Sequence, residues 1–410
     1  MATDQIDQQQ EEGTGGLGEV FRAFLKLGLT SFGGPIAHLG YFRDELVVRR
    51  RWLTEAAYAD LIALCQFLPG PASSQVGFAL GYLRGGLAGA LLAWAAFTLP
   101  SAVLLLAFAF GADAFGGPIG QDVIHGLKLV AVAIVAQAVW GMARTLAPDR
   151  ERATIALAAV LVVVFVPTAF GQIAAIGAGA VAGTLRCRRV DRNAAGHLPV
   201  SISRRAGMVL LALFLLLLLG LPAIAALWSL PELALFEVFY RAGALVFGGG
   251  HVVLPLLEMR LVEPGWVSAD AFLAGYGAAQ AVPGPLFTFA VYLGAIAEPG
   301  SNGILGAAIA LLGIFLPGML LLMGVLPFWD RLRHYEGARA AMAGTNAAVV
   351  GILGAALYQP VWTGAVSSPS DFAVALTAFI LLTAWKAPPW LVVVVTLLAA
   401  VALGLVSQPV

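Results

Sequence analysis

The sequence predicts an all-α polytopic membrane protein with two inverted-topology repeats, broken or re-entrant helices, and a linking transmembrane span. Three observations support this prediction. The 410 residues are 60% hydrophobic and only 11% charged, whereas soluble domains are about half apolar and a quarter charged. Uncharged runs long enough to cross a bilayer recur along the chain. The unusual residues of the first half recur in the second half in the same order.

Residues 1–17 are polar and mildly acidic, and they lack the basic start and apolar run of a cleavable signal peptide. We expect them to form a disordered cytoplasmic tail. The two cysteines, Cys65 and Cys187, are too few for a disulfide framework or a metal cluster. The chain has no P-loop, HExxH or GxSxG motif. We therefore expect no cofactor, no metal site and no catalytic residues.

Three segments of the first half align with three of the second half. They are FRAFLKLGLTSFGG (21–34) with FEVFYRAGALVFGG (236–249), WLTEAAYADLIALCQFLPGP (52–71) with WVSADAFLAGYGAAQAVPGP (266–285), and GLAGALLAWAAFTLP (86–100) with GILGAAIALLGIFLP (303–317). Chance matching of Leu and Ala would not select Phe-Gly-Gly, Trp, Gln, Pro-Gly-Pro and Leu-Pro. We expect a first transporter repeat at 18–190, a basic loop and linking transmembrane helix at 191–230, and a second repeat at 231–410.

The basic residues indicate that the second repeat is inverted relative to the first. Lys and Arg concentrate in cytoplasmic loops, so the arginine-rich loop between the halves should be cytoplasmic. Arg49, Arg50 and Arg51 precede Trp52, whereas the counterpart in the second half carries only Arg260 beside two glutamates. After the next span the bias reverses, and the basic residues are Arg331, Arg333 and Arg339 of the second half.

This polarity constrains the path of the chain. If the N-terminus and the loop at 49–51 are both cytoplasmic, residues 21–41 must enter the membrane and return, and so must residues 52–83. Each repeat then holds two hairpins and four full spans. The spans are expected near 86–112, 122–146, 153–168 and 170–186, near 303–328, 338–360, 371–386 and 388–406, and near 207–228 for the link. The alternative is that the broken segments cross fully as kinked helices.

Four breaks interrupt the apolar segments, at residues 33–35, 69–71, 248–250 and 283–285. Irregular backbone at membrane depth requires burial by protein or a water-filled cavity. Proline suits the first turn of a following helix, where free N–H groups and the helix dipole favour an anion. The expected gating or hinge residues are Pro35, Pro69, Pro71, Pro283 and Pro285. The alternative is that the breaks are packing kinks.

Polar side chains next to the breaks complete the candidate site. Hydroxyl and amide groups beside the breaks can donate hydrogen bonds. Gln66 and Gln280 occupy equivalent positions in the two repeats, and the cations Lys26 and Arg241 do so as well. Snorkelling of Lys26 to the interface is the alternative. The expected substrate-binding residues are Lys26, Ser31, Gly33, Gly34, Gln66, Gly70, Ser73, Ser74, Arg241, Gly249, Gln280, Gly284 and Thr288. His38 and His251 are candidates for proton coupling, with a hydrogen-bonded packing role as the alternative. Lys128 and Asn346 are further polar residues within spans.

The chemistry of these side chains favours an oxyanion as the substrate. Acidic residues are sparse inside the spans, whereas a transported metal cation needs oxygen or thiolate ligands. Helix N-termini, hydroxyls, amides and a few cations suit an anion instead.

The stretches FLKLGLTSFGGPIAHLGYFRDELV and WLTEAAYADLIALCQFLPGPASSQVGF, with FYRAGALVFGGGHVVLPLL and AQAVPGPLFTFAVYLGA, resemble the chromate ion transporter family in its long, duplicated form. The resemblance begins near residue 20 and covers nearly the whole remaining chain. The family motifs fall on Phe32, Gly33, Gly34, Pro35, His38, Gln66, Pro69, Gly70 and Pro71, and Gly250 replaces the first-motif proline in the second repeat. The resemblance implies a multi-pass protein of the bacterial inner (cytoplasmic) membrane that exports chromate and confers chromate resistance.

The expected mechanism is alternating access driven by the membrane potential or by proton coupling. Uptake or exchange of sulfate or another oxyanion is the alternative, because sulfate has nearly the shape and charge of chromate. A membrane-embedded enzyme or an assembly subunit is a further alternative, although no acid–base pair is visible. The expected partners are chromate or sulfate, the lipid bilayer and a second copy in a homodimer. The zero net charge gives no indication of nucleic acid.

Overall fold

The computed structural model describes residues 16–32, 34–111, 118–187, 202–228, 230–247, 250–298, 302–332 and 335–407. These residues form helices and connecting turns without a strand. Five of their helices are long and apolar enough to cross a membrane, at 72–111, 120–146, 204–228, 303–332 and 336–362, and shorter apolar helices accompany them. The predicted class, an all-α polytopic membrane protein, is confirmed.

The first half contains α2 (Leu17–Thr30), α3 (Gly34–Phe42), the π-helical turn η1 (Arg43–Arg49), α4 (Glu55–Phe67), α5 (Ala72–Gly111), α6 (Pro118–Leu146), α7 (Arg150–Phe165) and α8 (Ala169–Arg186). Helix α5 changes direction at Gly85 and Gly86, where Gly86 has a φ of +62° that favours glycine. The part before this bend returns from the second break, and the part after it is the first full span. Helix α9 (Arg204–Trp228) links the halves.

The second half repeats this order. It contains α10 (Pro231–Leu245), η3 (Gly250–Val252), α11 (Val253–Leu261), α12 (Ala269–Ala281), η4 (Leu286–Thr288), α13 (Phe289–Ile296), α14 (Gly303–Val325), η5 (Leu326–Phe328), α15 (Trp329–Leu332), α16 (Glu336–Ala356), η6 (Leu357–Trp362), α17 (Pro369–Thr383) and α18 (Pro389–Ser407). The full spans lie within a few residues of their predicted positions. The predicted boundary at residue 190 and most of the predicted tail lie outside the described residues.

The broken segments of the first half are hairpins. The carboxylate of Glu19, in the first turn of α2, accepts hydrogen bonds from Arg50 (3.2 Å), from the indole of Trp52 (3.1 Å) and from Arg84 (3.1 Å). Arg50 follows η1, Trp52 precedes α4, and Arg84 ends the first part of α5. Because both ends of each broken segment meet at Glu19, the two segments enter and return. The alternative of fully crossing kinked helices is wrong for them.

The second half has equivalent hairpins. Glu237 of α10 forms an ion pair of 2.6 Å with Arg260 of α11, which joins the two arms of the first hairpin. The amide of Glu298, after α13, donates a 2.9 Å hydrogen bond to the carbonyl of Trp266, before α12. The second hairpin therefore also closes at the end where it began.

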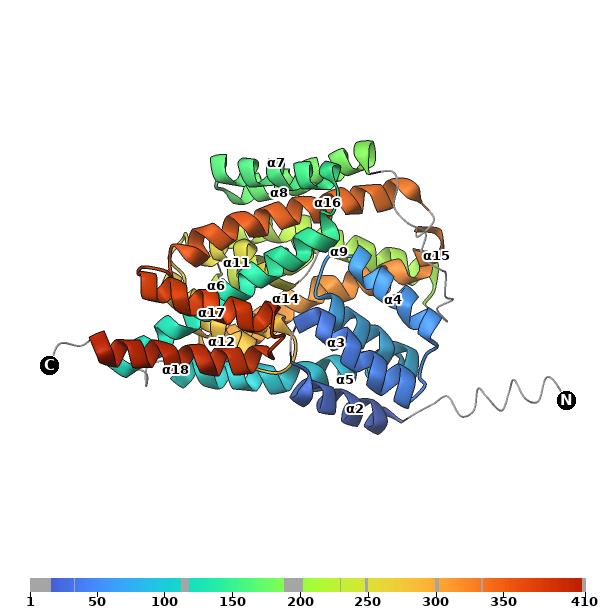
Figure 1. The fold of residues 1–410 in the computed structure, drawn as a ribbon. Helices are drawn as coiled ribbons and strands as arrows, with labels where there is room; N and C mark the ends of the chain where they lie inside the picture. The colour runs from blue at the N-terminus through green and yellow to red at the C-terminus, as the bar shows by residue number, and fades with distance from the viewer. Residues whose placement is uncertain are drawn as a thin grey trace.

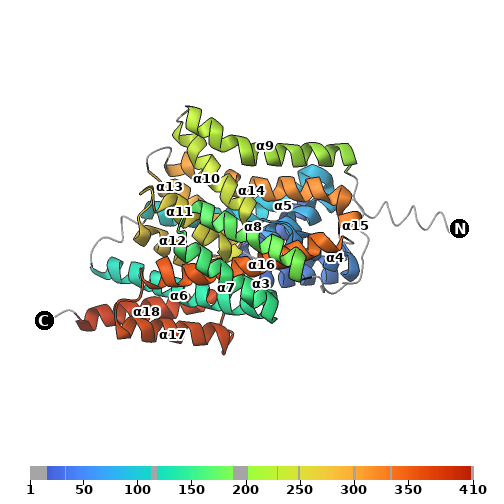
Figure 2. The same ribbon diagram turned by 90° about the horizontal axis from the view of Figure 1, so that it is seen from above.

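The two sets of hairpins enter from opposite ends of the molecule. Figure 1 shows α2, α3 and α4 toward one end of the long axis and α11 and α12 toward the other. Figure 2, turned about that axis, shows α3 and α4 separated from α11 and α12 in the same way, with α9 running along the outer edge of the molecule. This arrangement is the inverted topology that the arginine distribution predicts.

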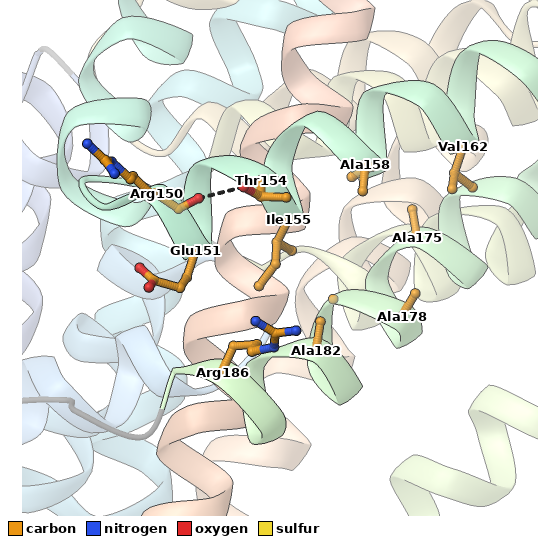
Figure 3. Close-up of a pocket in the computed structure, with 12 residues that line it drawn as sticks. Arg150, Glu151, Thr154, Ile155, Ala158, Val162, Ala175, Ala178, Ala182 and Arg186 are labelled. Atoms are coloured by element: carbon orange, nitrogen blue, oxygen red, sulfur yellow. Dashed lines mark hydrogen bonds between the residues drawn. The ribbon is translucent and has the colours of Figure 1, made fainter.

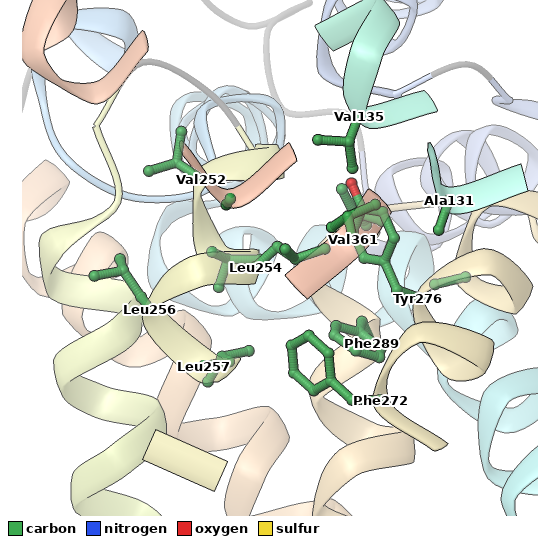
Figure 4. Packing of buried hydrophobic residues seen from close by; sticks show 14 of the residues in the cluster. Ala131, Val135, Val252, Leu254, Leu256, Leu257, Phe272, Tyr276, Phe289 and Val361 are labelled. Atoms are coloured by element: carbon green, nitrogen blue, oxygen red, sulfur yellow. The ribbon is translucent and has the colours of Figure 1, made fainter. Parts of the chain in front are cut away.

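Aromatic and branched side chains of the second-repeat hairpins pack on one another and share a buried cluster with Ala131 and Val135 of α6 (Figure 4). Phe272 and Tyr276 of α12 contact the ring of Phe289 edge to face, with centroids 5.3 and 5.7 Å apart. Leu254 and Leu257 of α11 belong to the same buried cluster (Figure 4). Helix α9, in contrast, exposes large apolar side chains such as Leu216 and Leu219, as a helix facing lipid does. This buried cluster therefore contains residues of both repeats.

Candidate functional site

The breaks of the two repeats are hydrogen-bonded to each other. The amide of Gly70 donates to the carbonyl of Val246 at 2.7 Å, and the amide of Gly284 donates to the carbonyl of Ser31 at 2.9 Å. Ser31 and Val246 occupy equivalent positions in the aligned repeats, as do Gly70 and Gly284. The exchange is therefore reciprocal, as expected for two halves related by a pseudo-two-fold axis.

Each Pro-Gly-Pro break also packs on the long helix of the other repeat. A Cβ added to Gly70 would lie 3.1 Å from the Cα of Gly318, next to Pro317 in α14. A Cβ on Gly284 would lie 2.8 Å from the Oγ of Ser101, next to Pro100 in α5. The φ angles of Gly70 and Gly284 are +125° and +104°. Both the backbone angle and the close approach require glycine at these positions.

Polar residues gather around the break of the first repeat. The Nδ1 atom of buried His38 lies 3.3 Å from the Oγ of Ser73, in the first turn of α5. The imidazole ring meets Phe97 edge to face at 5.4 Å. Ser31 and Ser74 are also buried. We call Ser31, His38, Ser73, Ser74, Thr98 and Ser101 the break cluster.

Several buried polar atoms at this place have no hydrogen-bond partner among the described residues. Those at the break cluster and its neighbours are Ser31 Oγ, His38 Nε2, Ser74 Oγ, Gln75 Oε1, Thr98 Oγ1 and Gln280 Nε2. Leaving a buried polar group unpaired costs about 1–3 kcal/mol. Most of these atoms belong to groups that donate hydrogen bonds. The arrangement is suited to a ligand or waters rich in acceptor atoms.

The equivalent positions in the second repeat are apolar. Val246, Val253 and Phe287 stand where the first repeat has Ser31, His38 and Ser73. The hydroxyl of Thr288 donates to the carbonyl of Pro285 at 2.7 Å, so it is already satisfied. The polar lining of the site therefore comes mainly from the first repeat.

The backbone beside the first break leaves open space. Gly34 has a φ of +77°, and a Cβ added there would meet no atom within 4 Å. Pro35 lies in the first turn of α3, whereas Pro71 and Pro285 directly precede α5 and η4. Pro69 and Pro283 lie in the turns before them. The candidate residues Gly33 and Gly249 lie outside the described residues.

The predicted cations lie away from the unpaired atoms. The ammonium of Lys26 is 2.7 Å from the carboxylate of Glu45, and its side chain is 49% exposed. The guanidinium of Arg241 is 2.6 Å from Glu237. Gln66 is exposed, unlike its equivalent Gln280, whose amide nitrogen is buried. The structure thus brings His38 to Ser73, and through Gly284 it brings Ser31 close to Ser101, whereas it engages Lys26 and Arg241 in ion pairs. Gln280 lies one helical turn before Gly284, at the end of α12.

Glu45 joins the arms of the first hairpin through several cations. Its carboxylate accepts hydrogen bonds from Lys26, Arg49 and Arg50, and the side chain is only 8% exposed. Burial raises the pKa of this carboxyl, but the three hydrogen bonds outweigh burial and leave the pKa at about 2. Glu45 lies in η1, outside the membrane-spanning helices, and it serves to hold the hairpin closed.

A cavity of about 540 Å³ lies at the end from which the second-repeat hairpins enter. Lys128 of α6 lines it, and its ammonium is 2.7 Å from the exposed carboxylate of Asp270 at the start of α12. His125 lines it too, with Nε2 2.7 Å from Asp371 of α17. We call this cavity the Lys128 vestibule. His251, by contrast, bonds to the hydroxyl of Tyr276 at 2.6 Å.

Sequence reasoning missed His125, Thr98, Ser101 and Glu45. The signal for His125 and Lys128 was their spacing of three residues, which places both on one face of α6. The signal for Thr98 and Ser101 was their position on either side of Pro100. Among the described residues, no group of three or more His, Cys, Asp and Glu side chains is placed to hold a metal ion.

Comparisons with known proteins agree with this architecture. A family model described as chromate transporter matches residues 18–184 and again residues 233–405. The chain is 30% identical to the chromate transport protein of Pseudomonas aeruginosa, over 93% of this chain and 90% of that protein. It is 28% identical to the chromate transport protein of Cupriavidus metallidurans, over 94% and 92% of the two chains. It is 24% identical to an uncharacterized transporter of Methanocaldococcus jannaschii, over 81% of each.

No solved structure matches the chain significantly. The first two of these relatives are named as chromate transport proteins. The match extends over both halves and over nearly the whole length of those relatives. The chain therefore belongs to the chromate transporter family.

Proposed function

We propose that the chain is a secondary transporter that exports chromate from the cytoplasm by alternating access between its inverted halves. The observation that carries the proposal is the set of unpaired buried polar atoms at the break cluster. Chromate is a tetrahedral dianion with four acceptor oxygens. Hydroxyl, imidazole and amide donors match such a ligand, and the first turns of α3 and α5 add backbone N–H groups.

The site residues of this proposal are chosen for their buried polar atoms without a partner and for the glycine geometry at the breaks. Ser31, His38 and Ser74 donate to the oxyanion from the first repeat, and Gln280 donates from the second. Gly34, Gly70 and Gly284 supply the backbone geometry. The ion-paired residues Lys26 and Arg241 hold their hairpins and act on the substrate only at a distance. The Lys128 vestibule is the compartment through which the anion passes on the other side of the breaks.

The arginines support an inner-membrane orientation with the N-terminus in the cytoplasm. Arg50 and Arg84 meet at Glu19, at the end where α2 begins. Short connections make successive spans antiparallel, which brings Arg150 and Arg186 to that same end. Basic residues mark the cytoplasmic side. The break cluster then lies between this side and the Lys128 vestibule, which opens outward.

The membrane potential supplies the direction of transport. Moving one charge through 100 mV changes the free energy by about 2.3 kcal/mol. A dianion leaving a cell with a negative interior therefore gains about 4.6 kcal/mol per 100 mV, or roughly a thousandfold in gradient. Outward movement needs no ATP, which agrees with the absence of a P-loop from the sequence.

The test is chromate flux into inside-out vesicles or oriented proteoliposomes. We expect chromate uptake that rises with an interior-positive potential, and competition by excess sulfate, which has the same shape and charge. A protein carrying Ser31→Ala and Ser74→Ala should lose chromate affinity while remaining folded. Proton uptake measured together with chromate flux distinguishes coupling through His38 from transport driven by potential alone. Chromate entering only right-side-out vesicles would overturn the export direction, and flux unchanged in the double variant would overturn the site.

A further inference from the structure

A groove separates α7 from α8 and lies away from the break cluster. Figure 3 shows it lined along its length by small and branched side chains from both helices, including Ala158, Ala178 and Ala182. Its volume is about 510 Å³. Arg150, Glu151 and Arg186 lie at one end. The groove therefore has one charged end and an apolar body.

The position of α7 and α8 places this groove against lipid. Their inner faces pack on α16, where Gly179 and Gly183 of α8 approach the backbone around Gly344. Their outer faces expose large apolar side chains such as Leu157 and Val181. In a membrane protein such a face contacts acyl chains. The occupant of the groove must then be apolar along most of its length.

The length of the groove corresponds to one leaflet of a bilayer. It follows α7 from Arg150 to Val162, and 12 residues of helix rise about 18 Å. One leaflet contributes about half of the ~30 Å hydrocarbon core. The charged end lies at the end of the molecule where the other arginines gather, which basic residues mark as cytoplasmic.

The charges at the mouth favour an anionic headgroup. Arg150 and Arg186 are exposed, and no carboxylate of the described residues lies within ion-pair distance of either. The negative charge of Glu151 offsets one of these two positive charges, so the charged end of the groove carries one net positive charge. A basic residue near an anionic membrane surface contributes about 1 kcal/mol, a roughly fivefold preference for an anionic over a zwitterionic lipid.

We propose that the groove between α7 and α8 binds one anionic phospholipid, with the headgroup phosphate at Arg150 and Arg186 and an acyl chain along the alanines. The dimensions argue against a helix from a second copy of the chain. A volume of about 510 Å³ spread over about 18 Å gives a mean cross-section of about 28 Å². A helix about 10 Å across needs about 80 Å².

The test is native mass spectrometry of the full chain in detergent, titrated with dioleoyl phosphatidylglycerol or dioleoyl phosphatidylcholine. The two lipids have the same chains and differ in headgroup charge. We expect one tightly bound lipid and a roughly fivefold preference for phosphatidylglycerol. Arg150→Gln or Arg186→Gln should reduce that preference to about one. Glu151→Gln should raise it by about fivefold, to roughly 25-fold.

Matched variants separate the groove from general lipid contact. Arg144→Gln removes an exposed arginine near the end of α6, outside the groove, and should leave the preference unchanged. Ala178→Trp fills the groove and should abolish the tight binding of either lipid. Leu157→Trp, on the exposed face of α7, should leave the tight lipid binding intact. Inorganic phosphate, which has the charge without the chains, should not displace the lipid.

Three results would overturn the proposal. One is equal binding of the two lipids by the wild-type chain. Another is a preference that Arg150→Gln, Arg186→Gln and Glu151→Gln leave unchanged. The third is a lipid-free dimer that Ala178→Trp converts to monomer, which would assign the groove to a second copy. Circular dichroism of each variant confirms that its helices are retained, and the readout does not depend on chromate transport.

Discussion

The amide of Gly284 donates a 2.9 Å hydrogen bond to the carbonyl oxygen of Ser31, although the two residues are 253 positions apart along the chain. Ser31 directly precedes the first glycine-rich break, and Gly284 is the centre of the last Pro-Gly-Pro break. The bond therefore joins the interruption of one repeat to the interruption of the other. Any movement of one hairpin relative to the opposite repeat must break or shift this bond.

The glycine at this contact has two constraints, and a matched pair of variants separates them. Gly284→Ala places a Cβ 2.8 Å from Ser101 Oγ at a φ of +104°. Gly34→Ala faces a φ of +77° with no atom within 4 Å. Both replacements strain the backbone by about 1–2 kcal/mol, and only Gly284→Ala adds overpacking of about 1–3 kcal/mol. Thermal unfolding in detergent should show a larger fall in Tm for Gly284→Ala. An equal fall in Tm for the two variants would contradict the close approach of Gly284 to Ser101.

The unpaired hydroxyl of Ser31 predicts opposite effects on stability and on binding. Ser31→Ala removes a buried atom that has no partner, so the Tm should stay constant or rise. Chromate affinity should fall about fivefold, as expected when one hydrogen bond of about 1 kcal/mol is lost. Thr288→Val is the control, because that hydroxyl is already bonded to Pro285. It should lower the Tm slightly and leave chromate affinity unchanged. Isothermal titration calorimetry and thermal unfolding measure both quantities, and a fall in Tm without a loss of affinity in Ser31→Ala would assign Ser31 to packing.

The ion pair of Lys128 with Asp270 predicts a role for the vestibule in anion passage. Lys128→Gln removes a nearly buried ammonium and should lower chromate flux about tenfold, since a hydrogen bond from a charged donor contributes about 1.5–3 kcal/mol. Asp270→Asn frees the ammonium and should raise chromate affinity measured from the vestibule side. The second change removes a carboxylate that is 71% exposed, so it should hardly change the Tm. Chromate flux into vesicles is measured at low and at high ionic strength. Salt should reduce the difference in flux between each variant and the wild type. Unchanged flux in Lys128→Gln would remove the vestibule from the pathway.

The low pKa of Glu45 predicts that acid weakens the first hairpin. A carboxyl whose pKa is about 2 in the fold, below its ordinary value of 4.5, stabilises the fold above pH 5 and loses that contribution as the pH falls toward 2. Between pH 7 and pH 4 the loss is about 1 kcal/mol. Thermal unfolding at the two values should show a fall in Tm that Glu45→Gln reduces. Glu55→Gln, at an exposed pair with Arg43, should keep the wild-type fall. A fall of the same size in Glu45→Gln would show that other carboxyls cause it.

The helices and their breaks could be predicted from the sequence because their causes are local. Apolar runs, glycine pairs and prolines act within a few residues of their own positions, so the full spans and the hairpin turns follow from the order of residues. The repeated Phe-Gly-Gly and Pro-Gly-Pro motifs indicate the family and the duplication for the same reason. The arginine distribution adds the direction of each half.

Only the tertiary structure decides which residues of the two halves meet. Gly70 bonds to Val246, and Lys26 bonds to Glu45 rather than facing the breaks. His125 bonds to Asp371 across most of the chain. These partners are set by the packing of whole helices against one another, and such packing depends on side chains distributed over the entire fold. The sequence by itself determined that the chain carries two sets of broken helices suited to an oxyanion. The packing of those breaks against each other determined which buried donors have no partner at the proposed site.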